Sequence, residues 1–216
     1  FVLILGLIIF SPLFGILNKF ELNIYYLIEF FQSNYNLRLI FFTFLQAFIS
    51  SLISCILALP FALSLFRRKK IFIFRIIISL TGYSFVLPSI LIVYSVIGIF
   101  GTNGLLNQIT NFYNLFNIKT IFGLQGILIA HILLNTPFAT RIFIQNLNSI
   151  PKNYIDVAKS MNFSFWQSFF YIEWPILKQN FFSIFSIIFI LCFLSFAIVM
   201  ALGGGPRYST LEVAIY

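Results

Sequence analysis

The chain has 216 residues, of which 61% are hydrophobic and only 8% charged, and its mean hydropathy is +1.03. A soluble domain usually carries about 25% charged residues, so this composition excludes a water-soluble domain and predicts an integral membrane protein. The formal net charge of +8 then indicates positively charged cytoplasmic loops rather than nucleic-acid binding.

Five apolar runs reach or approach the length of about 17 to 25 residues that spans a bilayer as a helix. They are continuous rather than alternating, which argues against the strands of a membrane barrel, and helices satisfy their own backbone hydrogen bonds in lipid. We therefore expect an all-α protein with five transmembrane helices, at residues 1–17, 39–66, 71–100, 123–144 and 176–202.

The two ends of the chain lie inside or next to apolar sequence. Phe1 stands within the first run, and Tyr216 follows the last run without a polar tail. The first run has no basic segment before it and no cleavage-like site, so a signal peptide is not expected. We interpret residues 1–216 as one transmembrane domain that is truncated at both ends.

Prolines and polar residues interrupt the apolar runs. Proline removes an amide donor and kinks a helix, and a polar side chain within a span is a functional candidate. His131 and Asn135 are one helical turn apart, where they either line a path or hydrogen-bond a neighbouring helix as a packing contact. Candidates for a translocation path are Tyr83, Pro88, His131, Asn135 and Pro137.

The loop between the third and fourth runs, residues 103–119, places apolar side chains near one helical face. Such a segment is typical of a short helix that lies on the membrane surface. The alternative interpretation is a gating lid over the outer side.

Basic residues divide unequally between the two sides of the predicted spans. Nine lie on one side, at Arg67, Arg68, Lys69, Lys70, Arg75, Arg141, Lys152, Lys159 and Lys178. Four lie on the other, at Lys19, Arg38, Lys119 and Arg207. Because Lys and Arg concentrate in cytoplasmic loops, we expect the side with nine to be cytoplasmic.

The sequence contains no recognisable metal-binding, catalytic or phosphate-binding motif. Cys55 and Cys192 each lie in an apolar run without metal-like spacing and are interpreted as small buried hydrophobic residues. There is no catalytic Ser/His/Asp pattern and no phosphate-binding G-x-x-x-x-G-K-[ST] loop. We expect no metal, no cofactor and no enzymatic activity of the chain itself.

A polar insert separates the fourth and fifth runs, with the sequence "DVAKSMNFSFWQSFFYIEWP" at 156–175. Asn148 or Ser149 is expected to cap a helix that has Pro151 in its first turn. Asn162 follows that helix, where it tolerates a left-handed bend. Ser164 and Gln167 then form a capping-box pattern, and a second short helix is expected to run to about Ile172, with Pro175 opening the fifth span.

The first helix of the insert carries a narrow apolar stripe of Ile155, Ala158 and Met161. Two short helices with a sharp bend and an apolar edge are suited to docking into a groove of a partner. The alternative is an ordinary connecting loop.

The insert resembles the cytoplasmic coupling loop of ATP-binding-cassette importer permeases. The family pattern is E-A-A, three residues, G, nine residues, then I-x-L-P. The spacing is kept throughout, with Asp for Glu, Val for Ala, Asn for Gly and Trp for Leu. The corresponding residues are Asp156, Val157, Ala158, Asn162, Ile172, Trp174 and Pro175.

The resemblance extends from about Leu39 to the end of the chain. This part of the sequence is similar to the first half of thiamine importer permeases in the segments "LQGILIAHILLNTPFATRIFIQNL", "FYIEWP" and "LCFLSFAIVMALGGGPRYSTLEVAIY". Iron(III) importer permeases share much of this pattern, including the Gly-rich segment, so iron(III) is the alternative substrate.

The resemblance implies a multi-pass permease of the bacterial cytoplasmic (inner) membrane. Its partners are a cytoplasmic ATPase dimer, a periplasmic or extracellular substrate-binding protein and a second permease half, fused or separate. The coupling loop is 146–175, with the candidate residues Pro151, Ile155, Asp156, Val157, Ala158, Met161, Asn162, Ile172, Trp174 and Pro175.

The outward Gly-rich segment is a candidate contact for the binding protein, because its glycines allow unusual backbone geometry. A simple turn before the next span is the alternative. The candidate residues are Gly203, Gly204, Gly205, Pro206 and Arg207.

An ion-coupled secondary transporter and a membrane enzyme are the competing classes. Ion coupling predicts carboxylates inside the membrane. The five carboxylates are all expected in loops or at span ends, at Glu21, Glu29, Asp156, Glu173 and Glu212. A membrane enzyme requires a metal or nucleophile cluster, and none is visible.

The basic-residue distribution predicts that residues 67–70 and 145–175 face the cytoplasm. A cysteine placed at Lys69 should be labelled by an impermeant reagent only from the cytoplasmic side of spheroplast-derived membranes. Labelling of that cysteine from the outside alone would contradict the predicted orientation.

Overall fold

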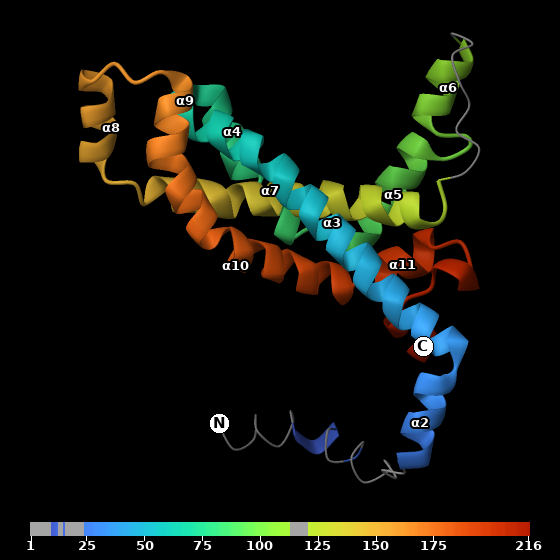
Figure 1. The fold of residues 1–216 in the computed structure, drawn as a ribbon. Coiled ribbons are helices and arrows are strands. Elements are labelled where there is room, and N and C mark those ends of the chain that lie inside the picture. Colours follow the sequence, from blue (N-terminus) through green and yellow to red (C-terminus); the bar gives the residue numbers. More distant parts are fainter. Residues whose placement is uncertain (1–9, 13–14, 16–23, 113–120) are drawn as a thin grey trace. The chain divides into compact units, whose positions relative to one another are not determined.

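The computed structural model describes residues 10–12, 15, 24–112 and 121–216, and all regular elements in these residues are helical (Figure 1). Contacts divide the chain into two compact units, Phe1–Arg38 and Leu39–Tyr216. The helices are α2 (Ile24–Gln32), α3 (Asn34–Arg67), α4 (Phe72–Leu80), α5 (Ser89–Phe100), α6 (Leu105–Phe112), α7 (Leu124–Asn148), α8 (Lys152–Ser160), α9 (Phe165–Ser168), α10 (Trp174–Phe193), α11 (Phe196–Leu202) and α12 (Leu211–Ile215), with the short turns η1 (Tyr83–Phe85), η2 (Phe169–Glu173) and η3 (Pro206–Tyr208).

Within the described residues, four helical stretches are long and apolar enough to cross a membrane. They are Asn34–Arg67, Ser89–Ile109, Leu124–Asn148 and Phe165–Phe193. These stretches confirm the all-α membrane class and approximate the expected number of spans. The run expected at 1–17 lies outside the described residues, apart from 10–12 and 15, and the expected surface segment at 103–119 is described only as far as the end of α6.

The third apolar run is broken rather than continuous. α4 ends at Leu80, a 3-10 turn follows, and α5 begins only after Pro88. The residue before a proline is disfavoured in the helical region, which accounts for the new start. The hydroxyl of Thr81 donates to the carbonyl of Ile78 at 2.7 Å, and that of Ser84 to the carbonyl of Thr81 at 2.9 Å, so side chains satisfy backbone groups that the break leaves without helical partners.

The fifth apolar run is also broken, between Phe193 and Phe196. Neither proline nor glycine stands at this break, where Ser195 adopts φ −89° and ψ 82°. The side-chain amide of Gln46 on α3 donates to the carbonyl of Cys192 at 3.1 Å. A carbonyl at the open end of α10 is thus satisfied by a neighbouring helix, as membrane-buried backbone requires.

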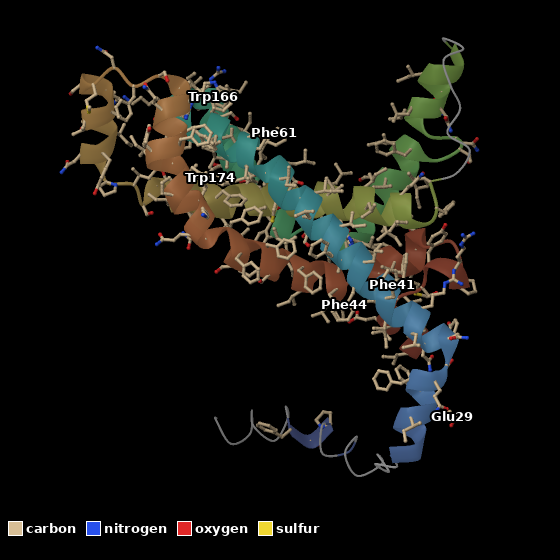
Figure 2. The ribbon with its side chains drawn as sticks, in the orientation of Figure 1. Glu29, Phe41, Phe44, Phe61, Trp166 and Trp174 are labelled. Carbon is tan, nitrogen blue, oxygen red and sulfur yellow. The ribbon has the colours of Figure 1, made fainter. Side chains whose placement is uncertain are left out.

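Small and polar side chains form the packed face of α3. Small side chains let transmembrane helices approach closely. Larger side chains of α7 and α10, such as Phe143 and Ile188, complete the same core. Outside this face, the ring of Phe44 meets that of Phe193 edge to face at a centroid distance of 5.1 Å (Figure 2). The buried residues of the α3 face include Thr43, Gln46, Ala47, Ser50, Ser54, Ala58 and Ala62.

The two ends of the second unit differ in character. At one end the last turn of α3 lies beside α9 (Figure 1), and the ammonium of Lys69 donates to the side-chain oxygen of Asn148 at 2.8 Å. At the other end the amide of Gly123 donates to the carbonyl of Leu202 at 2.7 Å. The two basic segments expected on one side of the membrane therefore lie together.

Candidate functional site

The bend of the polar insert has the geometry that its sequence predicted. α8 ends at Ser160, and Asn162 adopts φ 51°, the only positive φ of a non-glycine residue in the described ranges. The amide of Phe163 donates to the carbonyl of Ala158 at 2.9 Å, which is the closing bond of a left-handed helix end. At the other end, Pro151 itself occupies the cap position without a side-chain cap bond, so the expected cap by Asn148 or Ser149 is wrong: Asn148 instead accepts from Lys69, and the Ser149 hydroxyl donates to the Asn146 carbonyl.

The second helix of the insert begins as predicted and does not end as predicted. Both bonds of the capping box are present, at 3.3 Å from the amide of Gln167 to the Ser164 hydroxyl and at 2.8 Å from the Ser164 amide to the Gln167 side chain. The expected stop near Ile172 is wrong, because α9 continues through the π turn η2 into α10. Pro175 lies in the first turn of α10, where a missing amide hydrogen is tolerated.

The exposed apolar edge of α8 differs from the predicted stripe. Ala158 is buried and Ile155 half-buried, so these two face the rest of the protein, and only Met161 of the predicted set is exposed. The outward row instead consists of Tyr154, Val157 and Met161, which recur at intervals of three and four residues. This row is the exposed apolar surface of α8.

An ion pair between a buried carboxylate and a partly exposed guanidinium joins the insert to α3. Glu173, which is 4% exposed in η2, receives two hydrogen bonds from the guanidinium of Arg67, of which the bond from Nε is 2.8 Å long. The same guanidinium lies 3.7 Å from the ring centroid of Phe165, a cation–π arrangement. The last residue of α3 is thus held by α9 and η2 together.

Sequence reasoning missed this pair. Glu173 was expected in a loop or at a span end, whereas it lies inside the continuous helical stretch Phe165–Phe193. Arg67 was counted only as one of the basic residues of a loop. A signal was available, since a lone Glu between apolar and aromatic residues indicates a buried carboxylate that needs a partner.

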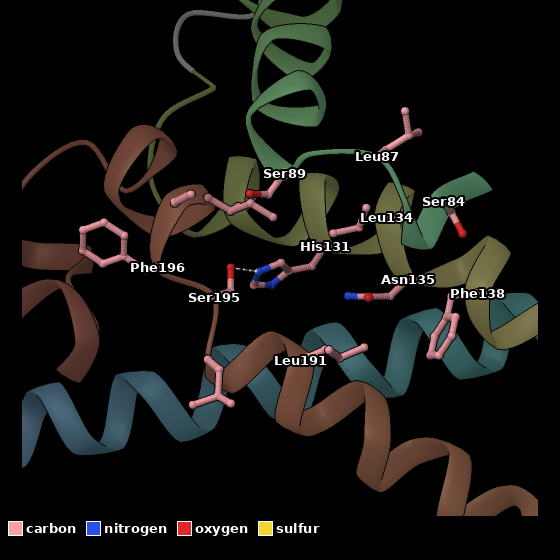
Figure 3. Close-up of a pocket in the computed structure, with 13 residues that line it drawn as sticks. Ser84, Leu87, Ser89, His131, Leu134, Asn135, Phe138, Leu191, Ser195 and Phe196 are labelled. Atoms are coloured by element: carbon pink, nitrogen blue, oxygen red, sulfur yellow. Dashed lines mark hydrogen bonds between the residues drawn. The ribbon is translucent and has the colours of Figure 1, made fainter. Parts of the chain in front are cut away.

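The breaks of the third and fifth runs meet at a cavity of about 360 Å³ in the middle of the second unit. His131 of α7 is buried beside it and shares a hydrogen bond with the hydroxyl of Ser195 at 2.7 Å (Figure 3). Its other ring nitrogen shares a hydrogen bond with the hydroxyl of Ser50 at 3.1 Å. Asn135, one turn later, also lines the cavity and donates to the sulfur of Cys192 at 3.2 Å. Both residues therefore contact neighbouring helices and reach the cavity.

The remaining path candidates lie near this cavity but do not line it. Tyr83 and Pro137 line a second cavity of about 370 Å³, and Tyr83 is strongly exposed. Pro88 is exposed just before α5. Ser195 and Ser84 line the first cavity and were not predicted, since a serine in an apolar run carries no pattern of its own.

The Gly-rich segment forms a tight turn before η3. Gly204 and Gly205 have φ values of 70° and 131°, which side chains rarely adopt. A Cβ atom at Gly204 would also lie 2.9 Å from the Cβ of Phe122. Gly203 is buried, whereas Pro206 and Arg207 are exposed, so the turn presents these two residues outward.

Comparison with known proteins gives one family and a set of named relatives. The family of binding-protein-dependent transport system inner membrane components matches residues 37–215. The thiamine transport system permease protein of Haemophilus influenzae is 40% identical over 186 residues, covering 86% of this chain and 34% of that protein. Its counterpart in Escherichia coli is 37% identical over the same shares, and that of Brucella abortus is 37% identical over 175 residues, or 81% of this chain and 32% of that protein. The chain spans about a third of the length of these relatives.

The buried pair predicts a large penalty for removing one partner. Glu173→Gln or Arg67→Gln should each lower the free energy of unfolding by about 3–5 kcal/mol, because the remaining charge is left without its partner. The double change Arg67→Met/Glu173→Leu should cost less than either single change. Thermal unfolding of the purified full-length protein in detergent measures all three.

Asp156→Asn is the matched control, because Asp156 pairs with Lys159 at 3.6 Å and both side chains are exposed. Exposed pairs contribute about 1 kcal/mol or less to stability. A Glu173→Gln protein as stable as Asp156→Asn would show that the buried pair does not hold the insert.

Proposed function

The chain belongs to the family of binding-protein-dependent transport system inner membrane components, and we propose that it forms the first half of an ATP-binding-cassette importer permease for thiamine or thiamine phosphates. The observation that carries the substrate is the 40% identity to a thiamine transport system permease protein along 86% of this chain. It favours thiamine over iron(III), the alternative left open by sequence motifs.

The polar insert, residues 146–175, is the proposed contact with a separate cytoplasmic ATPase dimer. Its support is geometric: α8 presents Tyr154, Val157 and Met161 to solvent, while Ala158 and Ile155 hold the helix against the protein. An amphipathic helix of this kind fits a groove. Closure of the ATPase would move α8, and the Arg67–Glu173 pair would transmit that movement to α3 and α10 as a rigid-body shift.

The cavity between the two helix breaks is the proposed substrate path. His131, Asn135 and the Ser195 hydroxyl supply hydrogen-bonding groups there, and broken helices in membranes are tolerated where they line a cavity. The cavity of one half is only part of a path, which the second permease half would complete. Tyr83, Pro88 and Pro137 remain candidates at its edge.

The turn at 203–207 is the proposed contact with the substrate-binding protein. It lies at the end of the second unit opposite α8 (Figure 1), and it exposes Pro206 and Arg207. A delivering protein on the outer side would meet this rigid turn rather than a flexible loop, because Gly204 packs against Phe122.

Ion-coupled transport is less well supported. Glu173 is a carboxylate within a candidate span, but both of its oxygens accept from Arg67. Ion coupling requires a membrane carboxylate that is available to the transported ion, and both oxygens of this one are engaged by the guanidinium.

The substrate proposal predicts thiamine uptake. A host that lacks its own thiamine transporter should accumulate labelled thiamine when it carries the full-length gene together with its ATPase and binding protein. Labelled iron(III) is the comparison substrate. Good membrane expression without uptake of thiamine or its phosphates would reject the substrate assignment.

The coupling proposal predicts distinct effects at the bend and on α8. Asn162→Val should destabilise the left-handed geometry by roughly 1–2 kcal/mol and reduce stimulation of the ATPase by loaded binding protein, whereas Asn162→Gly should be tolerated. Asp156→Lys should weaken co-purification of the ATPase at least tenfold if the carboxylate meets a basic group in the interface, since losing such a pair costs about 2–5 kcal/mol.

Asp156→Glu keeps the charge and is the control for Asp156→Lys. Full coupling and normal co-purification in both Asn162→Val and Asp156→Lys would show that the insert is a connector only.

A further inference from the structure

A cavity of about 590 Å³ lies between the end of α3, the following basic turn and α8. It is separate from the central cavity and from the outward row of α8. Its rim is unusual for a protein with few charges, because most of the cations at this end of the second unit gather there. The charged residues that line it are Arg67, Lys69, Lys70, Lys152, Asp156, Lys159 and Glu173.

Much of the negative charge at this rim is already neutralised. Glu173 is paired with Arg67, and Asp156 lies 3.6 Å from Lys159. In the described part of the chain, Lys70 and Lys152 have no carboxylate within ion-pair distance. The cavity therefore has a positive rim with cations available to an anion.

The floor of the same cavity is apolar. Phe66 and Ile150 are buried, and Phe163 and Ile172 are half-buried along its wall. A small hydrophilic anion gains nothing from such a floor, whereas a phosphate attached to an apolar group matches both parts. The chemistry that fits is a phosphate ester with an apolar portion.

The position of the cavity indicates that this phosphate ester is a membrane lipid. Arg67 is the last residue of a candidate span, so the cavity lies at the depth of the headgroups if α3 crosses the membrane. Trp166 of α9 (Figure 2) and Tyr171 of η2 lie close by and are strongly exposed. Exposed Trp and Tyr at the end of a span are typical of the membrane–water interface, and basic pockets at the cytoplasmic interface bind anionic headgroups.

We propose that this cavity binds the headgroup phosphate of an anionic phospholipid, between Lys70 in the turn after α3 and Lys152 at the start of α8. The proposal rests on the cytoplasmic orientation of this end in the proposed permease. A bound phosphate would join the start of α8 to the α3 turn by charge, at the opposite end of α8 from the Asn162 bend. Anionic lipid would then set the position of α8 before the ATPase docks.

The test is lipid binding by the full-length permease purified in detergent. Native mass spectrometry counts bound phosphatidylglycerol and phosphatidylcholine over a titration of each lipid. The wild-type protein should retain phosphatidylglycerol selectively, and Lys70→Gln/Lys152→Gln should lower its affinity roughly tenfold or more, since each basic residue near an anionic surface contributes about 1 kcal/mol. Arg75→Gln/Lys178→Gln removes two cations outside the cavity lining and should change the affinity less than twofold.

Three results would overturn the proposal. These are unchanged phosphatidylglycerol binding in Lys70→Gln/Lys152→Gln, an equal loss in Arg75→Gln/Lys178→Gln, and binding of soluble glycerol 3-phosphate as tight as that of the lipid. The last result would assign the cavity to a soluble phosphate ester instead. Thiamine uptake is measured separately, so selective lipid binding without uptake rejects only the substrate assignment, and uptake without selective lipid binding rejects only the lipid site.

Discussion

The ion pair between Arg67 and Glu173 is the constraint on which the polar end of this protein depends. A carboxylate that is 4% exposed requires a compensating charge, and the guanidinium supplies it with two hydrogen bonds. Because Arg67 ends α3 while Glu173 lies where α9 passes into α10, the pair fixes two long helices at one point. α8 and its bend are attached to that point through Phe163 and Ser164, so the geometry of the insert follows from where the pair is placed.

The sequence predicts local structure well where a single residue type decides it. Asn162 takes the left-handed bend because few other side chains tolerate it, and Ser164 with Gln167 makes the capping box because the spacing alone permits both bonds. The apolar runs predict helices because lipid leaves the backbone no alternative. These features depend on near neighbours in the chain and can be derived without knowledge of the fold.

The features that escaped prediction depend on contacts between distant segments. The break at Ser195 is held by Gln46 and His131, which are 149 and 64 residues away in sequence, and no local pattern announces it. α9 continues into α10 with Pro175 in the first turn of α10, and Glu173 at this junction is paired with Arg67, which is 106 residues away in the sequence. The spacing of the apolar residues on α8 was predicted correctly, but the direction of the exposed face was predicted wrongly. Ala158 is small and lets its side of α8 pack closely against the protein, and only the folded structure shows this contact.

The two helix breaks differ in how they are specified. At the first, Pro88 disfavours the helical conformation of the residue before it, so the chain itself favours a corner there, although Pro60 and Pro137 lie inside continuous helices. At the second, the side chains around Leu194 and Ser195 would permit a continuous helix, and the corner exists while hydrogen bonds from α3 and α7 hold it. Such a corner depends on contacts with α3 and α7 rather than on a proline or glycine at the break. One joint of this membrane domain is therefore favoured by its own sequence, and the other is held by hydrogen bonds from neighbouring helices.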